Sequence, residues 1–199
     1  MTEITAADVK ALRDRTGAGV LACREALTEA DGDVEHAVEI LRTRGQAQAA
    51  RRAGEEAREG VVQSYIHHGN RIGAMVEVNC QTDFVARNEK FIDFARELAL
   101  HVAARAPLAV SDEQVPAEDR EREVRIATEQ AAERPENVRE RIVSGKIDKW
   151  LDDVVLLRQP HVNEHKHGGR TIEELRVELA AETRENIVVR QFARFAIGG

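Results

Sequence analysis

Three histidines and a glutamate lie within seven residues in the last quarter of the chain, and zinc accepts both kinds of side chain as ligands. They are His161, Glu164, His165 and His167. The stretch follows Pro160 and runs into two glycines, so the sequence offers no helix that would fix the geometry of the ligands. We therefore interpret it as a surface loop and predict no metal site.

Gly17, Gly19 and Ala22 reproduce the GxGxxA spacing of a dinucleotide-binding turn. Such a turn works after a strand, where it delivers a pyrophosphate to the start of a helix. Here a helical pattern precedes it, so a turn that joins two helices is the better interpretation. Because the sequence also contains no GxxxxGK(S/T) loop, GxSxG elbow or HExxH helix, it predicts no cofactor and no catalytic residues. A small-molecule enzyme that uses this turn stays an alternative, which a cofactor-binding assay would test.

Asp83 and Phe84 stand side by side where an expected strand gives way to an expected helix. In a structural interpretation, Phe84 enters the core and Asp83 supplies negative charge to the first turn of its helix. In a functional interpretation, Phe84 enters a pocket of a partner protein, since aromatic residues are frequent among those that dominate binding energy. Asp83 would then bring a carboxylate into the same cleft. The residues alone leave both interpretations open.

Three short helices are expected in residues 1–45. Thr5 is a suitable N-cap with Asp8 three residues on, and Gly17 can adopt the left-handed conformation that ends many helices. The second helix has an apolar stripe at helical spacing, formed by Val20, Cys23, Leu27 and Ala30. Such a bundle has a small core, so we predict a helical domain that works attached to a larger one. Residues 46–60 are predicted to be a linker, partly helical.

Residues 61–199 are predicted to form an α+β core. Alternating apolar residues in VVQSYIHH and in the stretch from Ile72 to Val78 predict a β-hairpin, and NIVVRQFARF predicts a third strand. Thr82 or Asn88 is expected to cap the next helix. Further helices are expected over 117–134, over 136–159 and after Thr171, with a loop over 161–170. The predicted fold class is therefore α+β, with helices packed on a small, mostly antiparallel three-stranded sheet.

Charge and composition restrict the class of function. The formal charge of −7 comes from interspersed Glu and Arg, which gives no support to a nucleic-acid-binding face. No signal peptide is visible, and no apolar run approaches about 18 residues, so we expect a cytoplasmic protein without a membrane span. Cys23 and Cys80 belong to no CxxC pair, which argues against a zinc knuckle or a disulfide framework.

Four stretches, in this order along the chain, resemble the elongation factor Ts family, the guanine-nucleotide exchange factors of bacterial elongation factor Tu. They are VKALRDRTGAGVLACREALTEADGDVEHAVEILRTRG, VEVNCQTDFVARNEKF, GKIDKWLDDVVLLRQP and ENIVVRQFARF. The first stretch is similar to the family's N-terminal ubiquitin-associated-like domain, a three-helix bundle. The resemblance covers essentially the whole chain.

This resemblance implies functional roles for two segments. The family segment matched by Thr82, Asp83, Phe84 and Val85 dislocates Mg²⁺ from elongation factor Tu, as its aromatic side chain enters the GTPase domain. GDP then leaves and GTP can bind. A weaker contact with the GTPase domain is implied for the N-terminal domain, through Arg13, Thr16, Gly17, Gly19 and Val20. The core beyond residue 60 would contact a second domain of elongation factor Tu.

The chain departs from the family in two respects. Gln81 stands where many relatives carry Glu, a change that we expect to alter little. Longer members have two subdomains, whereas this chain has strands for one small sheet, so the resemblance implies pairing as a homodimer. An alternative function is a ubiquitin-associated-like adaptor on a dimeric scaffold, without exchange activity. That alternative would leave the Thr82–Val85 segment without a role.

Overall fold

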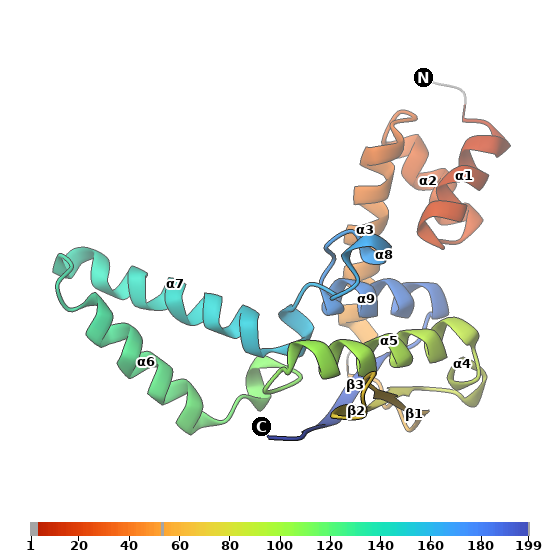
Figure 1. Cartoon of the computed structure of the whole chain (residues 1–199). Coiled ribbons are helices and arrows are strands. Elements are labelled where there is room, and N and C mark those ends of the chain that lie inside the picture. The colour runs from red at the N-terminus through yellow and green to blue at the C-terminus, as the bar shows by residue number, and fades with distance from the viewer. Residues whose placement is uncertain (1–3, 53, 199) are drawn as a thin grey trace. The chain divides into compact units, whose positions relative to one another are not determined.

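The computed structural model describes residues 4–52 and 54–198, which form helices and a three-stranded sheet (Figure 1). This confirms the predicted α+β class. The chain divides into two compact units, each built from segments that are distant in sequence. The first comprises Met1–Val61, Val78–Ile92 and Glu174–Val188; the second comprises Val62–Glu77, Asp93–Glu173 and Val189–Gly199. The domain boundaries predicted at residues 45 and 60 stay a prediction.

The first unit begins with three helices, α1 (Ala6–Thr16), α2 (Val20–Glu29) and α3 (Val34–Arg52). The Thr5 hydroxyl accepts the N–H of Asp8, whose carboxylate accepts the N–H of Thr5, so α1 begins in a capping box. It ends at Gly17, whose φ of 68° is a left-handed conformation that glycine adopts without steric cost. Both ends of α1 lie where the sequence predicts them.

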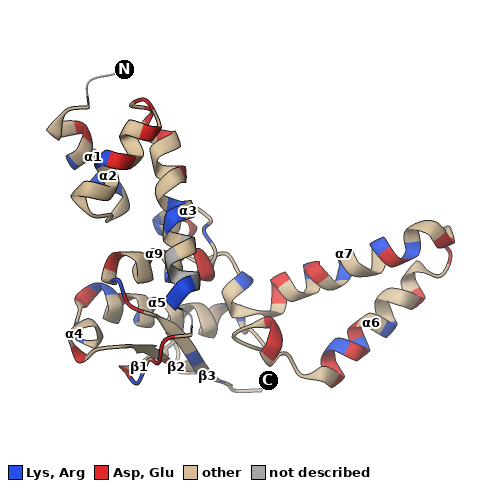
Figure 2. Cartoon of the chain, turned by 180° about the vertical axis from the view of Figure 1, so that it is seen from behind, with Lys and Arg blue, Asp and Glu red and all other residues tan. Residues whose placement is uncertain are grey.

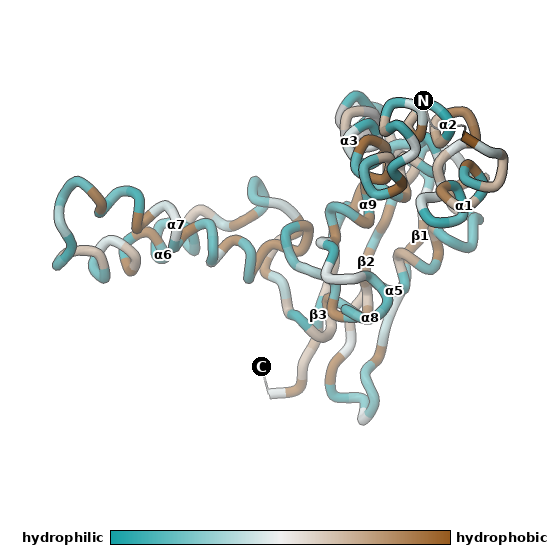
Figure 3. Tube along the Cα trace, turned by 90° about the horizontal axis from the view of Figure 1, so that it is seen from above, coloured by the Kyte–Doolittle hydropathy of each residue, from teal (hydrophilic) through white to brown (hydrophobic). Residues whose placement is uncertain are grey.

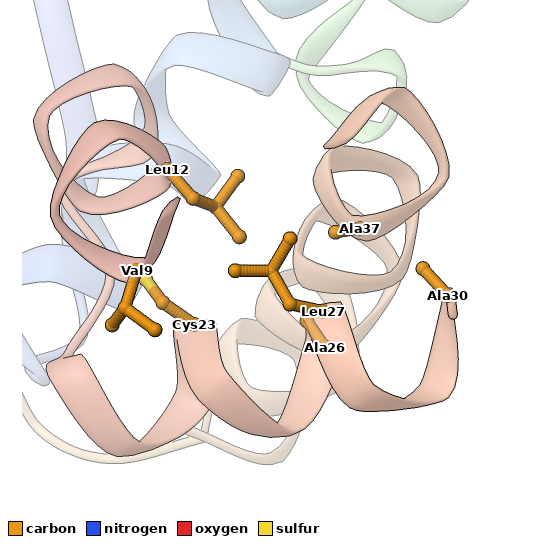
Figure 4. Packing of buried hydrophobic residues seen from close by; sticks show 7 residues of the cluster. All are labelled: Val9, Leu12, Cys23, Ala26, Leu27, Ala30 and Ala37. Carbon is orange, nitrogen blue, oxygen red and sulfur yellow. The ribbon is translucent and has the colours of Figure 1, made fainter. Parts of the chain in front are cut away.

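Small apolar side chains fill the space between these three helices (Figure 4). The buried cluster consists of Val9, Leu12, Cys23, Ala26, Leu27, Ala30 and Ala37. The predicted stripe of α2 therefore faces the core except at its first member, Val20, which is 56 % exposed. α3 continues to Arg52, through the first half of the predicted linker, which is helical there.

The end of β2 (Ile72–Cys80), the turn α4 (Asp83–Ala86), the start of α5 (Glu89–Arg105) and α9 (Ile172–Thr183) complete the first unit. α3 lies close to α9 at Gly45. A Cβ added to this glycine would be 3.4 Å from the Cβ of Ala181. An ion pair of 3.1 Å between Arg42 and Glu174 lies along the same contact. These contacts join the three-helix bundle to α9.

The sheet has the strand order β1 (Glu59–Ile66), β2, β3 (Val188–Ala196). β1 and β2 form the predicted hairpin, which the His67 N–H closes by donating to the Ile72 carbonyl at 2.8 Å. The Ile197 N–H donates to the Arg71 carbonyl at 2.9 Å, so β3 ends beside the start of β2 and runs antiparallel to it. On β3, Arg194 donates to the carbonyl of Ala103, which places α5 against one face of the sheet.

In the second unit, α6 (Ala117–Ala131) and α7 (Glu136–Val154) form a helical hairpin whose charges of both signs are interspersed (Figure 2). A buried cluster brings Ala127 together with Ile147 and Leu151 of α7. α7 ends at Val154, so the prediction of a helix to residue 159 is wrong. The next residue is extended and pairs with Ala109 in a parallel bridge, and a 3₁₀ turn, Leu156–Arg158, follows.

Residues 161–170, predicted to be a loop, contain one helical turn, α8 (Glu164–His167). The Asn163 side chain accepts the Lys166 N–H at its start, and Gly168 ends it in a left-handed conformation. A single turn of charged residues and histidines has no apolar periodicity, so hydrophobic patterning does not reveal it.

Over the described ranges, no helix combines the length and the apolar character that crossing a bilayer requires. Hydrophobic and hydrophilic residues are interspersed along α6 and α7, for example (Figure 3).

Candidate functional site

The chain passes from the sheet to α5 through the single helical turn α4. Thr82 caps this turn, since its hydroxyl accepts the Val85 N–H at 3.4 Å. Asn88 precedes α5, and its side chain accepts the Lys90 N–H at 2.9 Å. The two residues that the sequence offered as alternative caps are therefore both used, each for its own helix.

Phe84 is 80 % exposed, more than any other large hydrophobic side chain in the part of the chain that the structure describes. The geometry of α4 explains this exposure. Ala86 is the buried residue of the turn, and residues two apart on a helix point about 200° away from each other. Burying Ala86 thus turns the Phe84 ring outward, while Val85 is half-buried. The structural interpretation, in which Phe84 enters the core, is wrong.

Asp83 carries its carboxylate on the same exposed turn. Its Oδ2 lies 3.0 Å from Nη2 of Arg87, one turn further on, and 45 % of the Asp83 side chain stays exposed. Exposed pairs of this kind contribute only a few tenths of a kcal/mol to stability. The charge is therefore accessible next to the ring.

A carboxylate from near the other end of the chain holds the residues that lead into α4. Glu185 accepts the N–H groups of Gln81 and Thr82, at 2.9 and 3.0 Å, and the Thr82 hydroxyl at 2.5 Å. Next to it, the Asn186 N–H donates to Oε1 of Gln81 at 3.0 Å, and Nε2 of Gln81 donates to Glu55 at 2.8 Å. Sequence reasoning gave these residues no role, although the stretch ENIVVRQFARF begins with two of them.

Cys80, the last residue of β2, lies under this junction and donates its thiol to the Thr82 carbonyl at 3.2 Å. Burial, and then the nearby charge of Glu185, raises the pKa of the thiol to about 11. Cys80 is therefore protonated at pH 7 and is no nucleophile. Cys23 is also a free, buried cysteine.

The second predicted segment is the turn between α1 and α2. Gly17 ends α1 and Gly19 immediately precedes α2, so the GxGxxA spacing belongs to a turn that joins two helices, as interpreted from the sequence. The hydroxyl of Thr16 donates to the Leu12 carbonyl and is turned back onto its own helix. Arg13 is exposed nearby.

Beside this turn, Val20 is 56 % and Leu21 is 71 % exposed. The two side chains form an apolar spot on the surface of the three-helix bundle. Sequence reasoning named Val20 but missed Leu21, because Leu21 lies off the apolar stripe of α2 and its exposure is visible only in the folded bundle.

The turn between α1 and α2 lies against the C-terminal end of α9 and the residue that follows it, within the first compact unit. A Cβ built on Gly17 would lie 3.2 Å from Cδ of Glu182, and one on Gly19 would lie 3.5 Å from Nη2 of Arg184. Glu182 also forms an ion pair with Lys90 at the start of α5. The end of α9 therefore contacts both the turn between α1 and α2 and the start of α5, the helix that follows α4.

The histidine-rich stretch forms a polar cluster with Glu97 of α5, a residue that sequence reasoning did not include. Oε2 of Glu97 lies 2.8 Å from Nε2 of His167 and 3.5 Å from Nε2 of His161. These three ligand atoms lie within 4.8 Å of one another, close enough to share a metal ion. Glu164 and His165 are exposed and stand outside the cluster.

The hydrogen bonds of this cluster suit a metal-free network better than a metal centre. The Asn163 N–H donates to Nδ1 of His161 at 3.0 Å. A neutral imidazole that accepts at Nδ1 carries its proton on Nε2, which then has no lone pair for a metal. Lys166 already places a positive charge 2.7 Å from Glu97. Burial favours a raised pKa for Glu97, but hydrogen bonds from Lys166 and His167 outweigh burial and lower that pKa.

Comparison with known proteins gives the family. The family model described as Elongation factor TS matches residues 23–168. Elongation factor Ts of Desulfotalea psychrophila is 48% identical over 197 residues, which cover 98% of this chain and 98% of that protein. Elongation factor Ts of Moorella thermoacetica is 49% identical over 197 residues, or 98% of this chain and 96% of that protein. Elongation factor Ts of Desulfosudis oleivorans is 46% identical over 200 residues, which cover 100% of this chain and 100% of that protein.

The matched residues include the Thr82–Val85 segment, and the relatives match over nearly the full length of the chain. Both the exposed turn at Phe84 and the three-helix bundle thus lie within the region of similarity. The chain belongs to the elongation factor Ts family of translation elongation factors.

Proposed function

We propose that this elongation factor is a guanine-nucleotide exchange factor for elongation factor Tu. It binds the GDP form of its partner, displaces Mg²⁺ and promotes release of GDP, so that GTP can bind. The observation that carries the proposal is the exposed ring of Phe84 beside the carboxylate of Asp83. Both lie on a turn that Thr82 caps and whose cap is bonded to Glu185. Membership of the family supports the identity of the partner. No covalent bond changes, so the factor is not an enzyme in the chemical sense.

The mechanism follows from the way in which GTPases hold GDP. Backbone N–H groups and a lysine surround the phosphates, and Mg²⁺ neutralises their charge. A ring that enters beside this site shifts the loops that carry these groups, and a carboxylate brought with it repels the phosphates. Because several charge-assisted contacts weaken together, the nucleotide leaves faster.

Exchange also requires a difference in affinity. The factor must bind nucleotide-free elongation factor Tu more tightly than the GDP form, and it thereby stabilises an otherwise minor open conformation. By linkage, a nucleotide weakens the binding of the factor by the same ratio. GTP that enters the empty site therefore displaces the factor.

The proposal includes further contacts and the setting. The N-terminal bundle makes a weaker contact with the GTPase domain through Arg13, the Thr16–Gly19 turn and Val20, and the exposed Val20 and Leu21 side chains support this. The core beyond residue 60 contacts a second domain of elongation factor Tu. The protein acts in the cytoplasm as a homodimer and binds neither nucleic acid nor membranes; its net charge of −7 supports the lack of nucleic-acid binding.

Release of a fluorescent GDP analogue from elongation factor Tu, followed by stopped flow, tests the proposal. Wild type accelerates release, and Phe84→Ala reduces the acceleration about tenfold or more, as expected for an aromatic residue that dominates an interface. Because the ring is exposed, the same change leaves the free energy of unfolding in urea within about 0.5 kcal/mol of wild type.

A matched control is Ile126→Ala, which truncates another exposed apolar side chain, on α6, and is expected to leave exchange at the wild-type rate. If folded wild type fails to accelerate release, the exchange function is wrong. The adaptor interpretation, with Val20 and Leu21 as its contact, then takes its place.

A further inference from the structure

The carboxylate of Glu185 is the point at which the Thr82–Val85 segment is fixed to the rest of the first compact unit. Three donors converge on it: the N–H of Gln81, the N–H of Thr82 and the Thr82 hydroxyl. Thr82 and Glu185 are 103 residues apart in sequence, so this is a tertiary contact and not part of a local turn.

The two oxygens of a carboxylate can accept from all three donors at once. Oε2 accepts the two backbone N–H groups, and Oε1 accepts the hydroxyl. A glutamine at the same position has one acceptor oxygen; if that oxygen accepts the two N–H groups, the NH₂ group donates to the Thr82 hydroxyl, which then loses the acceptor for its own proton. The geometry therefore selects a glutamate side chain over its closest uncharged analogue.

The contact is transmitted to Phe84 through the cap of α4. Since the Thr82 hydroxyl gives its proton to Glu185, its lone pairs face the Val85 N–H that it accepts at 3.4 Å. This bond fixes where α4 begins, and the start of a four-residue turn decides which of its side chains point outward. The orientation of Phe84 is thus linked to Glu185 through the Thr82 hydroxyl, although Glu185 forms no hydrogen bond with Phe84.

Asn186 adds a hydrogen bond to Gln81, next to the segment, and is itself bonded to Glu55. The Asn186 N–H donates to Oε1 of Gln81 at 3.0 Å, and the Asn186 side chain donates to the Glu55 carbonyl at 2.7 Å. Glu185 and Asn186 thus bond to the neighbouring residues Gln81 and Thr82, so both the position and the direction of the chain entering α4 are defined. The same stretch, through Glu182, lies against Gly17 of the other predicted partner-binding segment.

We propose that Glu185 is a positioning residue for nucleotide exchange: it sets the orientation in which the Thr82–Val85 segment presents Phe84 to the partner. This inference rests on the exchange function proposed above. Glu185 does not enter the partner itself. It acts through the Thr82 hydroxyl and the cap of α4.

The test compares Glu185→Gln with Glu133→Gln, the same chemical change at an exposed residue that follows α6. The maximal rate of GDP release and the factor concentration that gives half of it are measured for wild type and both variants. Exchange of the Gln81 and Thr82 amide protons is followed in the free proteins by NMR. Urea unfolding reports the folded fraction.

Glu185→Gln is expected to lower the maximal rate about tenfold and to speed exchange of the two amides about tenfold or more, the size expected for lost hydrogen bonds to a charge. The concentration of Glu185→Gln that gives half of its maximal rate stays near the wild-type value, because the variant remains folded and the amount of active factor is unchanged. Glu133→Gln behaves as wild type. A role confined to stability would instead remove active protein, raising the half-saturating concentration while leaving the maximal rate unchanged.

An unchanged maximal rate for Glu185→Gln, or amides at residues 81 and 82 as protected as in wild type, overturns the proposal. Wild type is measured first, so that failure of the exchange function is seen separately. If wild type does not accelerate GDP release, the role of Glu185 in exchange fails with it.

Discussion

The aromatic ring of Phe84 is exposed to solvent although the backbone that carries it is fixed by hydrogen bonds. An exposed aromatic side chain on a mobile loop can fold back onto the surface, but α4 is capped by Thr82 and followed at once by α5. The buried Ala86 leaves no inward position for the ring. The exposure of Phe84 is therefore built into the local backbone and gains little for stability, which is the pattern expected of a residue kept for binding.

Gln81 uses both ends of its amide. The oxygen accepts the Asn186 N–H, and the NH₂ group donates to Oε2 of Glu55. A glutamate at position 81 keeps the first bond but places a second carboxylate against Glu55. The difference between Gln and Glu beside the Thr82–Val85 segment, from which the sequence predicts little effect, can therefore be tested through this contact.

We expect Gln81→Glu to lower the free energy of unfolding by about 1 kcal/mol at pH 7 and low salt, because two exposed like charges repel each other at this distance. Urea denaturation measures the loss, and high salt should reduce it by screening. The reversed pair, Glu55→Gln with Gln81→Glu, restores one donor and one acceptor and should recover most of the loss. A double variant no more stable than Gln81→Glu alone would contradict this account.

Among the elements of the second unit, α5 and the segment after α7 are joined by a buried histidine. His101 is fully buried; its Nε2 lies 2.8 Å from Oε1 of Gln159, and its Nδ1 accepts the Val162 N–H at 3.1 Å. Nδ1 therefore carries no proton, and Nε2 donates to Gln159. Burial lowers the pKa of His101 to about 4. Protonation would break the bond to Val162, so this contact requires the neutral ring.

The stability of the chain should fall as the pH falls below 6.5. In the unfolded chain His101 takes up a proton near its ordinary pKa of 6.5, whereas in the folded chain it stays neutral until about pH 4. The stabilisation is thus complete above pH 6.5 and is lost toward pH 4. We expect a loss of about 2 kcal/mol between pH 7.5 and pH 5, measured by urea denaturation.

Burial also lowers the pKa of His161, which adds to this loss. His101→Gln should therefore remove most, but not all, of the pH dependence. His36→Gln, at an exposed histidine, should retain it. An equal pH dependence in wild type and His101→Gln would show that His101 is not the group responsible.

The elements that the sequence predicted well are those whose signals are local. Thr5 with Asp8 and Gly17 define α1, and alternation defines the β1–β2 hairpin. The end of α7 was misplaced because a bridge from Val155 to Ala109 decides it, and no neighbour in the sequence reveals that bridge. α8 was missed because one turn carries too few residues for a periodic pattern.

The same division applies to the candidate site. Residue types and family resemblance pointed to Phe84, but its exposure stayed open because it depends on which side of α4 faces the interior. Glu185 was not predicted, since a glutamate before a strand gives no sign of a partner 103 residues away. Tertiary contacts, rather than local propensity, complete this site.

For the molecule as a whole, the uncovered face of the sheet supports the proposed homodimer. Arg194 reaches α5 on one face, while Phe195 points to the other and is 71 % exposed. On that face Ile66 is 61 % and Met75 is 49 % exposed. Apolar side chains gathered on one surface in this way are typical of an interface.

We expect wild type to elute with twice the chain mass of 22.2 kDa in size-exclusion chromatography with light scattering. Phe195→Glu should produce a folded monomer, because dimerisation would bury the new carboxylate. Ile126→Glu, which adds the same charge on α6, should remain a dimer. A Phe195→Glu protein with the wild-type mass would place the interface elsewhere.

The separation between Thr82 and Glu185 also has a consequence for synthesis, because their hydrogen bonds form only after both residues have been added to the chain. A ribosome synthesises Phe84 well before Glu185; with 103 residues between Thr82 and its anchor, at roughly 5–20 residues per second, the delay is roughly 5 to 20 s. During that time the nascent chain already carries the aromatic ring but not the carboxylate that orients it. Under the exchange function and the role of Glu185 proposed above, we expect that an emerging chain does not engage elongation factor Tu before Glu185 has been added.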